Sequence, residues 1–170
     1  MKKILVLVLA LCLLFPAIIG CSPSDDGTST SGSGSDASSE PTYEIQQYYD
    51  LVLSTQELLD TVADDIYSYW YDAIYKDKHG GSIDLAILSA QSANSVNLDT
   101  IESNNETIKN LYSQIKDSKL STEIKAVMQA YNAYYSLVVE VSGSFKSYSA
   151  DKETLKKELA NALKNLDFEL

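Results

Sequence analysis

Residues 43–76 read YEIQQYYDLVLSTQELLDTVADDIYSYWYDAIYK, with neither glycine nor proline. Along this stretch, residues suited to a buried helix side recur at alternating steps of three and four. They are Ile45, Tyr48, Val52, Thr55, Leu59, Val62, Ile66, Tyr69 and Ala73. The spacing predicts one helix about 50 Å long, at about 1.5 Å per residue. We expect Thr42 to be its N-cap and His79-Gly80-Gly81 to stop it.

A second helix is predicted to begin directly after the N-cap residue Ser82. It carries a seven-residue repeat through Ile87, Asn94, Ile101, Ile108 and Ile115. Three polar residues, Gln91, Asn94 and Asn105, fall on or beside this stripe. Such residues more often set the register of a bundle than contact a ligand, and we interpret them in that way.

A third helical stripe runs from Leu120 to Phe145 and has Gly143 inside it. Because glycine costs about 1 kcal/mol relative to alanine inside a helix, Gly143 indicates a kink, an end or a close helix contact. Asp151 can then cap a short last helix. The leucines of that helix that share one face are Leu155, Leu159, Leu163 and Leu166.

These patterns predict an all-α fold. Helices joined by short loops run antiparallel to their neighbours. We therefore expect an elongated up-down bundle of three long helices plus a short C-terminal helix, formed by residues 43–170 as one domain.

The N-terminus has the pattern of an export signal over residues 1–20. Lys2 and Lys3 precede an apolar run from Ile4 to Ile19 that is shorter than the roughly 20 residues of a membrane-spanning helix. Its end, Ile18-Ile19-Gly20-Cys21, resembles the lipobox of bacterial lipoproteins. The resemblance implies cleavage after Gly20, a diacylglycerol thioether on Cys21, and a cell-membrane location on the extracytoplasmic face.

Residues 21–42 are expected to form a disordered tether after the lipidated Cys21, because serine, glycine and aspartate dominate them. Removal of Lys2 and Lys3 with the signal lowers the formal charge of −11 by two. Such an acidic chain repels phosphate backbones, so we expect no nucleic-acid partner. The membrane is the expected partner, reached through the lipid on Cys21.

Residues for catalysis are scarce. His79 is the single histidine and is expected in an exposed turn, and no catalytic cysteine would remain in the exported chain. Asp64 and Asp65 point about 100° apart on a helix and cannot share a metal, whereas Asp60 and Asp64 could. We interpret those acids as a solvated face, with weak calcium contact as the alternative. The chain is therefore predicted not to be an enzyme and to need no cofactor or metal.

An aromatic cluster, IYSYWYDAIY, occupies residues 66–75. Tyr69 and Trp70 lie toward the buried side, and Tyr67, Tyr71 and Tyr75 form a row at steps of four. One interpretation is a central helix that packs on two sides. The other makes Tyr67, Trp70, Tyr71 and Tyr75 a binding strip for a sugar, a peptidoglycan fragment or a partner helix. Three tyrosines of the third helix could face this cluster: Tyr131, Tyr134 and Tyr135.

Residues 143–149, GSFKSYS, with the Lys/Leu-rich segment after them, loosely resemble the tail of uncharacterised helical lipoproteins of Gram-positive bacteria. That resemblance implies a shared bundle fold and no activity. The functional hypothesis is a tethered binding or scaffolding module at the cell surface, acting through a protein partner or self-association. The alternative is a lipid-anchored receptor for a small molecule, glycan or peptidoglycan fragment.

Overall fold

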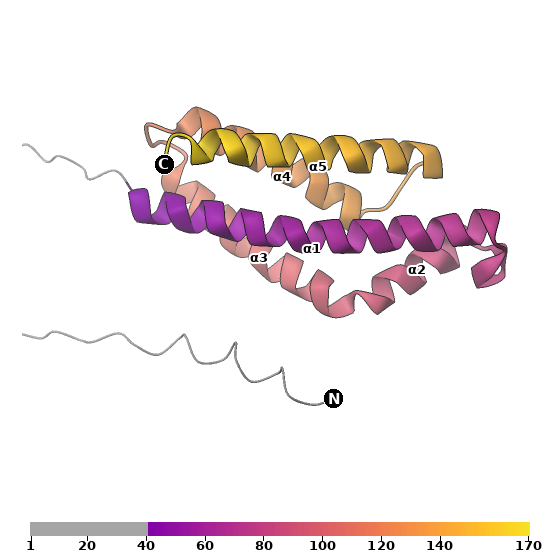
Figure 1. The fold of residues 1–170 in the computed structure, drawn as a ribbon. Coiled ribbons are helices and arrows are strands. Elements are labelled where there is room, and N and C mark those ends of the chain that lie inside the picture. Colours follow the sequence, from indigo (N-terminus) through magenta and orange to yellow (C-terminus); the bar gives the residue numbers. More distant parts are fainter. Residues whose placement is uncertain (1–40) are drawn as a thin grey trace, which may run out of the picture. The chain divides into compact units, whose positions relative to one another are not determined.

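The structure is a computed structural model that describes residues 41–170. All regular structure in this range is helical (Figure 1). The elements are α1 (Thr42–Tyr75), the 3-10 turn η1 (Lys78–Gly81), α2 (Ile83–Ala93), α3 (Ser95–Ile115), α4 (Ser121–Val139) and α5 (Phe145–Asp167). The predicted all-α class is therefore confirmed.

Helix α1 is the 34-residue helix that the opening pattern predicts. Its N-cap is Pro41, one residue before the expected Thr42, and it ends ahead of the turn at η1. Eight of the nine residues of the predicted stripe are buried, and Tyr69 is half-buried. Helix α1 packs against every other helix of the described range, so this stripe forms the centre of the core.

The second predicted helix is wrong as a single element, because the chain bends at Asn94 between α2 and α3 (Figure 1). The side-chain amide of Asn94 donates to Oδ2 of Asp65 on α1 at 2.8 Å and to the carbonyl of Ala90 at 3.1 Å. Its side-chain oxygen accepts a bond from Asn97 at 3.0 Å. A buried asparagine with local backbone partners competes with the helical ladder, which accounts for the bend.

The third predicted stripe does not form one helix as far as Phe145, and of the three alternatives for Gly143 the structure shows a helix end close before it. Helix α4 stops at Val139, and Gly143 lies in the connection with φ +87°. A new helix starts at Phe145 behind the N-cap Ser144, so the expected cap Asp151 lies inside it. Helix α5 is 23 residues long rather than short.

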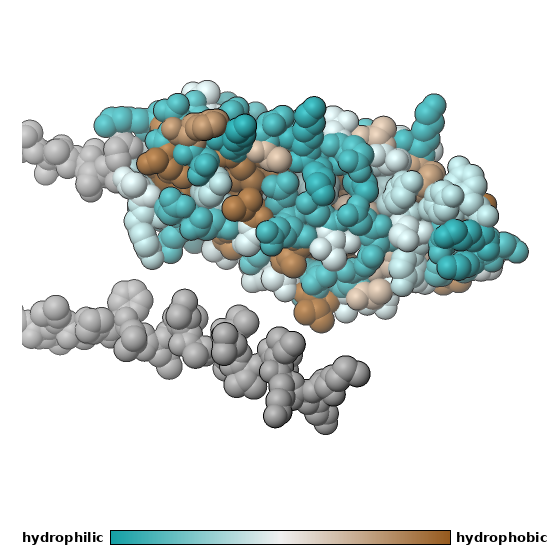
Figure 2. Space-filling model, in the orientation of Figure 1, coloured by the Kyte–Doolittle hydropathy of each residue, from teal (hydrophilic) through white to brown (hydrophobic). Residues whose placement is uncertain are grey.

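Figure 1 shows α1 and α5 lying along one another, with α4 beside α5 and with α2 and α3 on another side of α1. The core is rich in tyrosine: Tyr48, Tyr131, Tyr134 and Tyr148 are fully buried among aliphatic side chains. Figure 2 shows hydrophilic side chains over most of one face, interrupted by hydrophobic patches near the α4 and α5 ends and at the corner between α2 and α3.

No helix among residues 41–170 is long and apolar enough to cross a membrane. The expectations for the signal at 1–20, for Cys21 and for the tether fall almost wholly outside the described residues.

Candidate binding surface on the C-terminal half of α1

Three tyrosines form a row along the C-terminal half of α1. The rings of Tyr67 and Tyr71 are 6.3 Å apart between centroids, and those of Tyr71 and Tyr75 are 4.7 Å apart. Tyr67 is half-buried, Tyr71 is 37% exposed and Tyr75 is 63% exposed. The row therefore leaves the core and reaches solvent toward the end of the helix.

Phe145, the first residue of α5, packs against all three rings of the row. Its centroid is 5.0 Å from that of Tyr67, in a stacked arrangement, and 6.2 Å from those of Tyr71 and Tyr75. We call Tyr67, Tyr71, Tyr75 and Phe145 the aromatic strip. Sequence reasoning missed Phe145 because it placed this residue at the end of the third helix. The spacing of Ser144 and Ser147, which form a capping box at the start of α5, was the available signal.

Trp70 lies beneath the strip and is 3% exposed. Its ring meets Phe145 edge-on at 5.9 Å and is tilted against Tyr148 at 5.6 Å. Its Nε1 is buried without a hydrogen-bond partner. Trp70 thus supports the strip from below, while Tyr71 and Tyr75 present ring surface to solvent.

Ammonium groups lie beside two of the tyrosine rings of the strip. The Nζ of Lys152 lies 4.9 Å from the ring centroid of Tyr67, and that of Lys76 lies 5.4 Å from the ring of Tyr71. These are cation–π distances, at which the ring quadrupole attracts the charge. Asp72 pairs with Lys76 and with Lys78, each at 2.7 Å, and these hydrogen bonds hold the pKa of Asp72 below its usual range.

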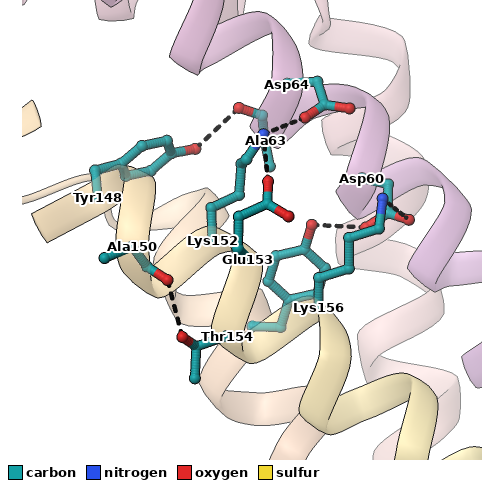
Figure 3. Close-up of polar contacts among 10 residues, drawn as sticks. Asp60, Ala63, Asp64, Tyr148, Ala150, Lys152, Glu153, Thr154 and Lys156 are labelled. Carbon is teal, nitrogen blue, oxygen red and sulfur yellow. Dashed lines mark hydrogen bonds and ion pairs between the residues drawn. The ribbon is translucent and has the colours of Figure 1, made fainter. Parts of the chain in front are cut away.

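Lys152 of α5 is almost buried against α1, where it pairs with Asp64 of α1 and with Glu153 of its own helix (Figure 3). Burial alone would lower the pKa of Lys152. The hydrogen bonds to the two carboxylates outweigh burial, so that pKa is raised and the ammonium stays charged. Nearby, the hydroxyl of Tyr148 donates to the carbonyl of Ala63 at 3.3 Å.

The predicted acidic pair on α1 is engaged by groups from other helices. Asp60 accepts a bond from the Tyr134 hydroxyl at 2.7 Å and pairs with Lys156 at 3.0 Å (Figure 3). Asp64 pairs with Lys152. Within residues 41–170, no group of three or more His, Cys, Asp or Glu residues is placed to hold a metal ion. The two aspartates therefore act as helix-to-helix contacts.

The other aromatic residues that the sequence singled out lie apart from the strip. Tyr69 stacks on His79 at 5.0 Å, and this contact half-buries the expected loop histidine. Tyr131 and Tyr134 are fully buried, and Tyr135 packs on Tyr131 at 6.0 Å. Of the polar stripe residues, Asn94 and Asn105 are buried and Gln91 is half-buried.

Two hollows are found away from the strip. One, of about 370 Å³, lies between α1 and α5 and includes Leu53, Asp60 and Lys164. The other, of about 360 Å³, lies between the start of α4 and the end of α5. Comparison of the chain with family models, curated proteins and solved structures finds no match.

Proposed function

We propose that this chain is a lipid-anchored binding or scaffolding module on the extracytoplasmic face of the cell membrane, built as an up-down helical bundle. The anchor is Cys21, behind the lipobox-like sequence Ile18-Ile19-Gly20. The contact surface is the aromatic strip. The observation that carries the proposal is the row of tyrosine rings, partly exposed and held in place by Phe145 and the buried Trp70.

The physical basis is preorganisation. Tyrosine offers a large, rigid contact area at a small cost in side-chain entropy, and the mutual ring contacts of the strip reduce that cost further. A helix of 34 residues holds the rings in a fixed row. A partner therefore meets a surface whose side chains are already ordered.

A glycan or peptidoglycan fragment is the second candidate ligand. The favouring observation is the succession of ring surfaces along one helix, with the Lys76 ammonium beside them. Rings in a row can stack on successive sugars of an extended chain, and an ammonium can meet a carboxylate or a hydroxyl at its edge.

The test of the strip compares the double substitution Tyr71→Ala and Tyr75→Ala with Tyr43→Ala, a well-exposed tyrosine at the other end of α1. Each full chain, displayed on cells, is crosslinked and purified, and is also sedimented with purified peptidoglycan. The proposal expects one crosslinked species, or peptidoglycan binding, to fall at least tenfold in the double variant and to remain with Tyr43→Ala, as for interface hot spots that contribute about 2 kcal/mol. Equal recovery in both variants would falsify the role of the strip.

The anchor has its own test. Mass spectrometry of the membrane fraction is expected to find a chain that begins at Cys21 and carries a lipid thioether there. Cys21→Ser is expected to release the chain from the membrane or to leave it uncleaved. An intact Met1 start on a membrane-free chain would contradict the proposed location.

A further inference from the structure

Helix α2 buries Ala86, Ala90 and part of Ile87, and it leaves its other large apolar side chains exposed. Ala86 and Ala90 are fully buried against α1, whereas Leu85 and Leu88 are 50% and 62% exposed. Val96, at the start of α3 just past the bend, is 76% exposed. In the described range, α2 contacts α1, η1 and α3 but neither α4 nor α5. We call Leu85, Leu88 and Val96 the α2 face.

An ordinary surface helix buries most of its large apolar residues, whereas α2 leaves Ile83, Leu85 and Leu88 exposed. Each exposed leucine leaves apolar surface in contact with water, and burial of that surface against a partner would be favourable. Figure 2 shows hydrophobic side chains at the corner between α2 and α3. A helix that leaves two leucines on one face exposed is suited to contact with another molecule.

The α2 face is also free of charge. Residues 85–98, LAILSAQSANSVNL, contain no Asp, Glu, Lys or Arg, although residues 43–170 carry 20 acidic residues and 11 lysines. Two copies of so acidic a domain repel one another over most of their surfaces. The α2 face is a place where they can meet without bringing like charges together.

We propose that the α2 face is a self-association surface, on which the α2 helix of a second copy packs antiparallel about a twofold axis near Leu88. Twofold contacts use the same patch on both copies. The antiparallel order places Asp84 of each copy across from the uncharged C-terminal half of the other α2. A lipid surface is a poorer occupant, because interfacial helices use lysine or arginine beside their apolar side and α2 has neither.

The small size of the face makes this association weak in solution. A standard interface buries roughly 800 Å² on each partner, far more than three half-exposed aliphatic side chains supply. Confinement to one membrane leaflet raises the effective concentration of the chains and favours such a contact. The strength of pairing therefore rests on the proposed lipid anchor, whereas the location of the surface does not.

The test is disulfide crosslinking of the full chain in a bacterial host that processes lipoproteins. Leu88→Cys is compared with Leu53→Cys, an exposed leucine on α1, and with the unsubstituted chain. Under mild oxidant, Leu88→Cys is expected to give a dimer of twice the chain mass about tenfold faster than Leu53→Cys, because close pairing raises the effective concentration of its thiols. Ser92→Cys, which the antiparallel order places about 12 Å along the paired helices from its own copy, is expected to crosslink far more slowly than Leu88→Cys, with the helical circular dichroism of both variants unchanged.

Three results would overturn the proposal: a Leu88→Cys chain that stays monomeric, one that joins only a protein of another mass, or one that dimerises no faster than Leu53→Cys. Dimerisation of the unsubstituted chain would reveal a free Cys21 thiol and count against the lipid anchor instead. The comparison of positions 88 and 53 would then be made with Cys12 and Cys21 replaced by serine. Failure of the anchor and failure of the α2 face are thereby distinguished.

Discussion

The phenol hydroxyl of Tyr134 on α4 donates a 2.7 Å hydrogen bond to Oδ1 of Asp60 on α1. The other oxygen of the same carboxylate lies 3.0 Å from the Nζ of Lys156 on α5. Three helices thus meet at one aspartate. The Tyr134 ring is fully buried, so its hydroxyl depends on Asp60 for the partner that water would otherwise provide.

Tyr134→Phe is expected to lower the free energy of unfolding by about 1–2 kcal/mol, because it removes a hydrogen bond to a carboxylate that remains partly open to solvent. Urea unfolding followed by circular dichroism measures the change. Tyr75→Phe, at an exposed position, is the control and is expected to stay within about 0.5 kcal/mol of the parent chain. Similar values for the two variants would show that the Tyr134 bond adds no stability.

Phe145→Ala should expose Trp70, because Phe145 covers the indole edge-on at 5.9 Å. Trp70 is the single tryptophan of the chain, so its fluorescence reports on the layer beneath the aromatic strip. We expect a red shift of its emission and a loss of about 2 kcal/mol, below the roughly 3–5 kcal/mol of a fully buried phenylalanine. Phe168→Ala, at the exposed end of α5, should leave the emission unchanged. An unshifted spectrum in Phe145→Ala would disprove the contact.

The first helix could be predicted almost to the residue because its pattern is uninterrupted for nine turns and its end is marked by Gly80 and Gly81. The row of Tyr67, Tyr71 and Tyr75 followed from helical spacing alone. Helical spacing did not predict whether these rings are buried, because their exposure depends on where α5 begins. The start of α5 is determined by packing between helices as well as by the local sequence.

The errors have two local causes. Asn94 fits a seven-residue repeat, so the stripe continued through it, but its side chain binds Asp65 and the backbone and bends the chain. The stripe from Leu120 to Phe145 crossed Gly143 because the residues after it, Ser144 and Ser147, were not recognised as a cap. Both errors arise where a short polar side chain competes with the backbone of a helix.

Alkaline pH should unfold the domain cooperatively. Burial is the main cause that raises the pKa of Tyr48, Tyr131, Tyr134 and Tyr148 above the usual value of about 10. Above that pH the unfolded chain loses these protons while the folded chain keeps them. The stabilising contribution is therefore complete below about pH 10 and declines as the pH rises further.

Tyrosinate absorbance and helical circular dichroism, recorded on the same samples, measure this transition. We expect a steep late phase of ionisation that coincides with loss of helix. Tyr148→Phe removes one buried ionisable hydroxyl, so the free energy of unfolding should decline less steeply above about pH 10. Ionisation of all 12 tyrosines in one gradual phase, with the helices intact, would show that the four rings are accessible.

Gly143→Ala tests the connection that positions Phe145. Gly143 has φ +87°, and a Cβ there would lie 2.9 Å from Oγ of Ser147. That hydroxyl accepts the N–H of Ser144 at 2.9 Å, while the Ser144 hydroxyl accepts the N–H of Ser147 at 3.1 Å. The alanine therefore strains the backbone by about 1–2 kcal/mol and disturbs a cap that contributes about 1 kcal/mol.

Gly143→Ala is accordingly expected to lower the free energy of unfolding by about 2–3 kcal/mol in urea titrations. Gly80→Ala is the matched control: it has φ +63° and nothing within 4 Å of the added Cβ, so it should cost only the backbone strain. Combining Gly143→Ala with Ser144→Ala should cost less than the sum of the two, since both act through the same cap. Full additivity, or equal losses for the two glycine variants, would mean that Gly143 does not act through the start of α5.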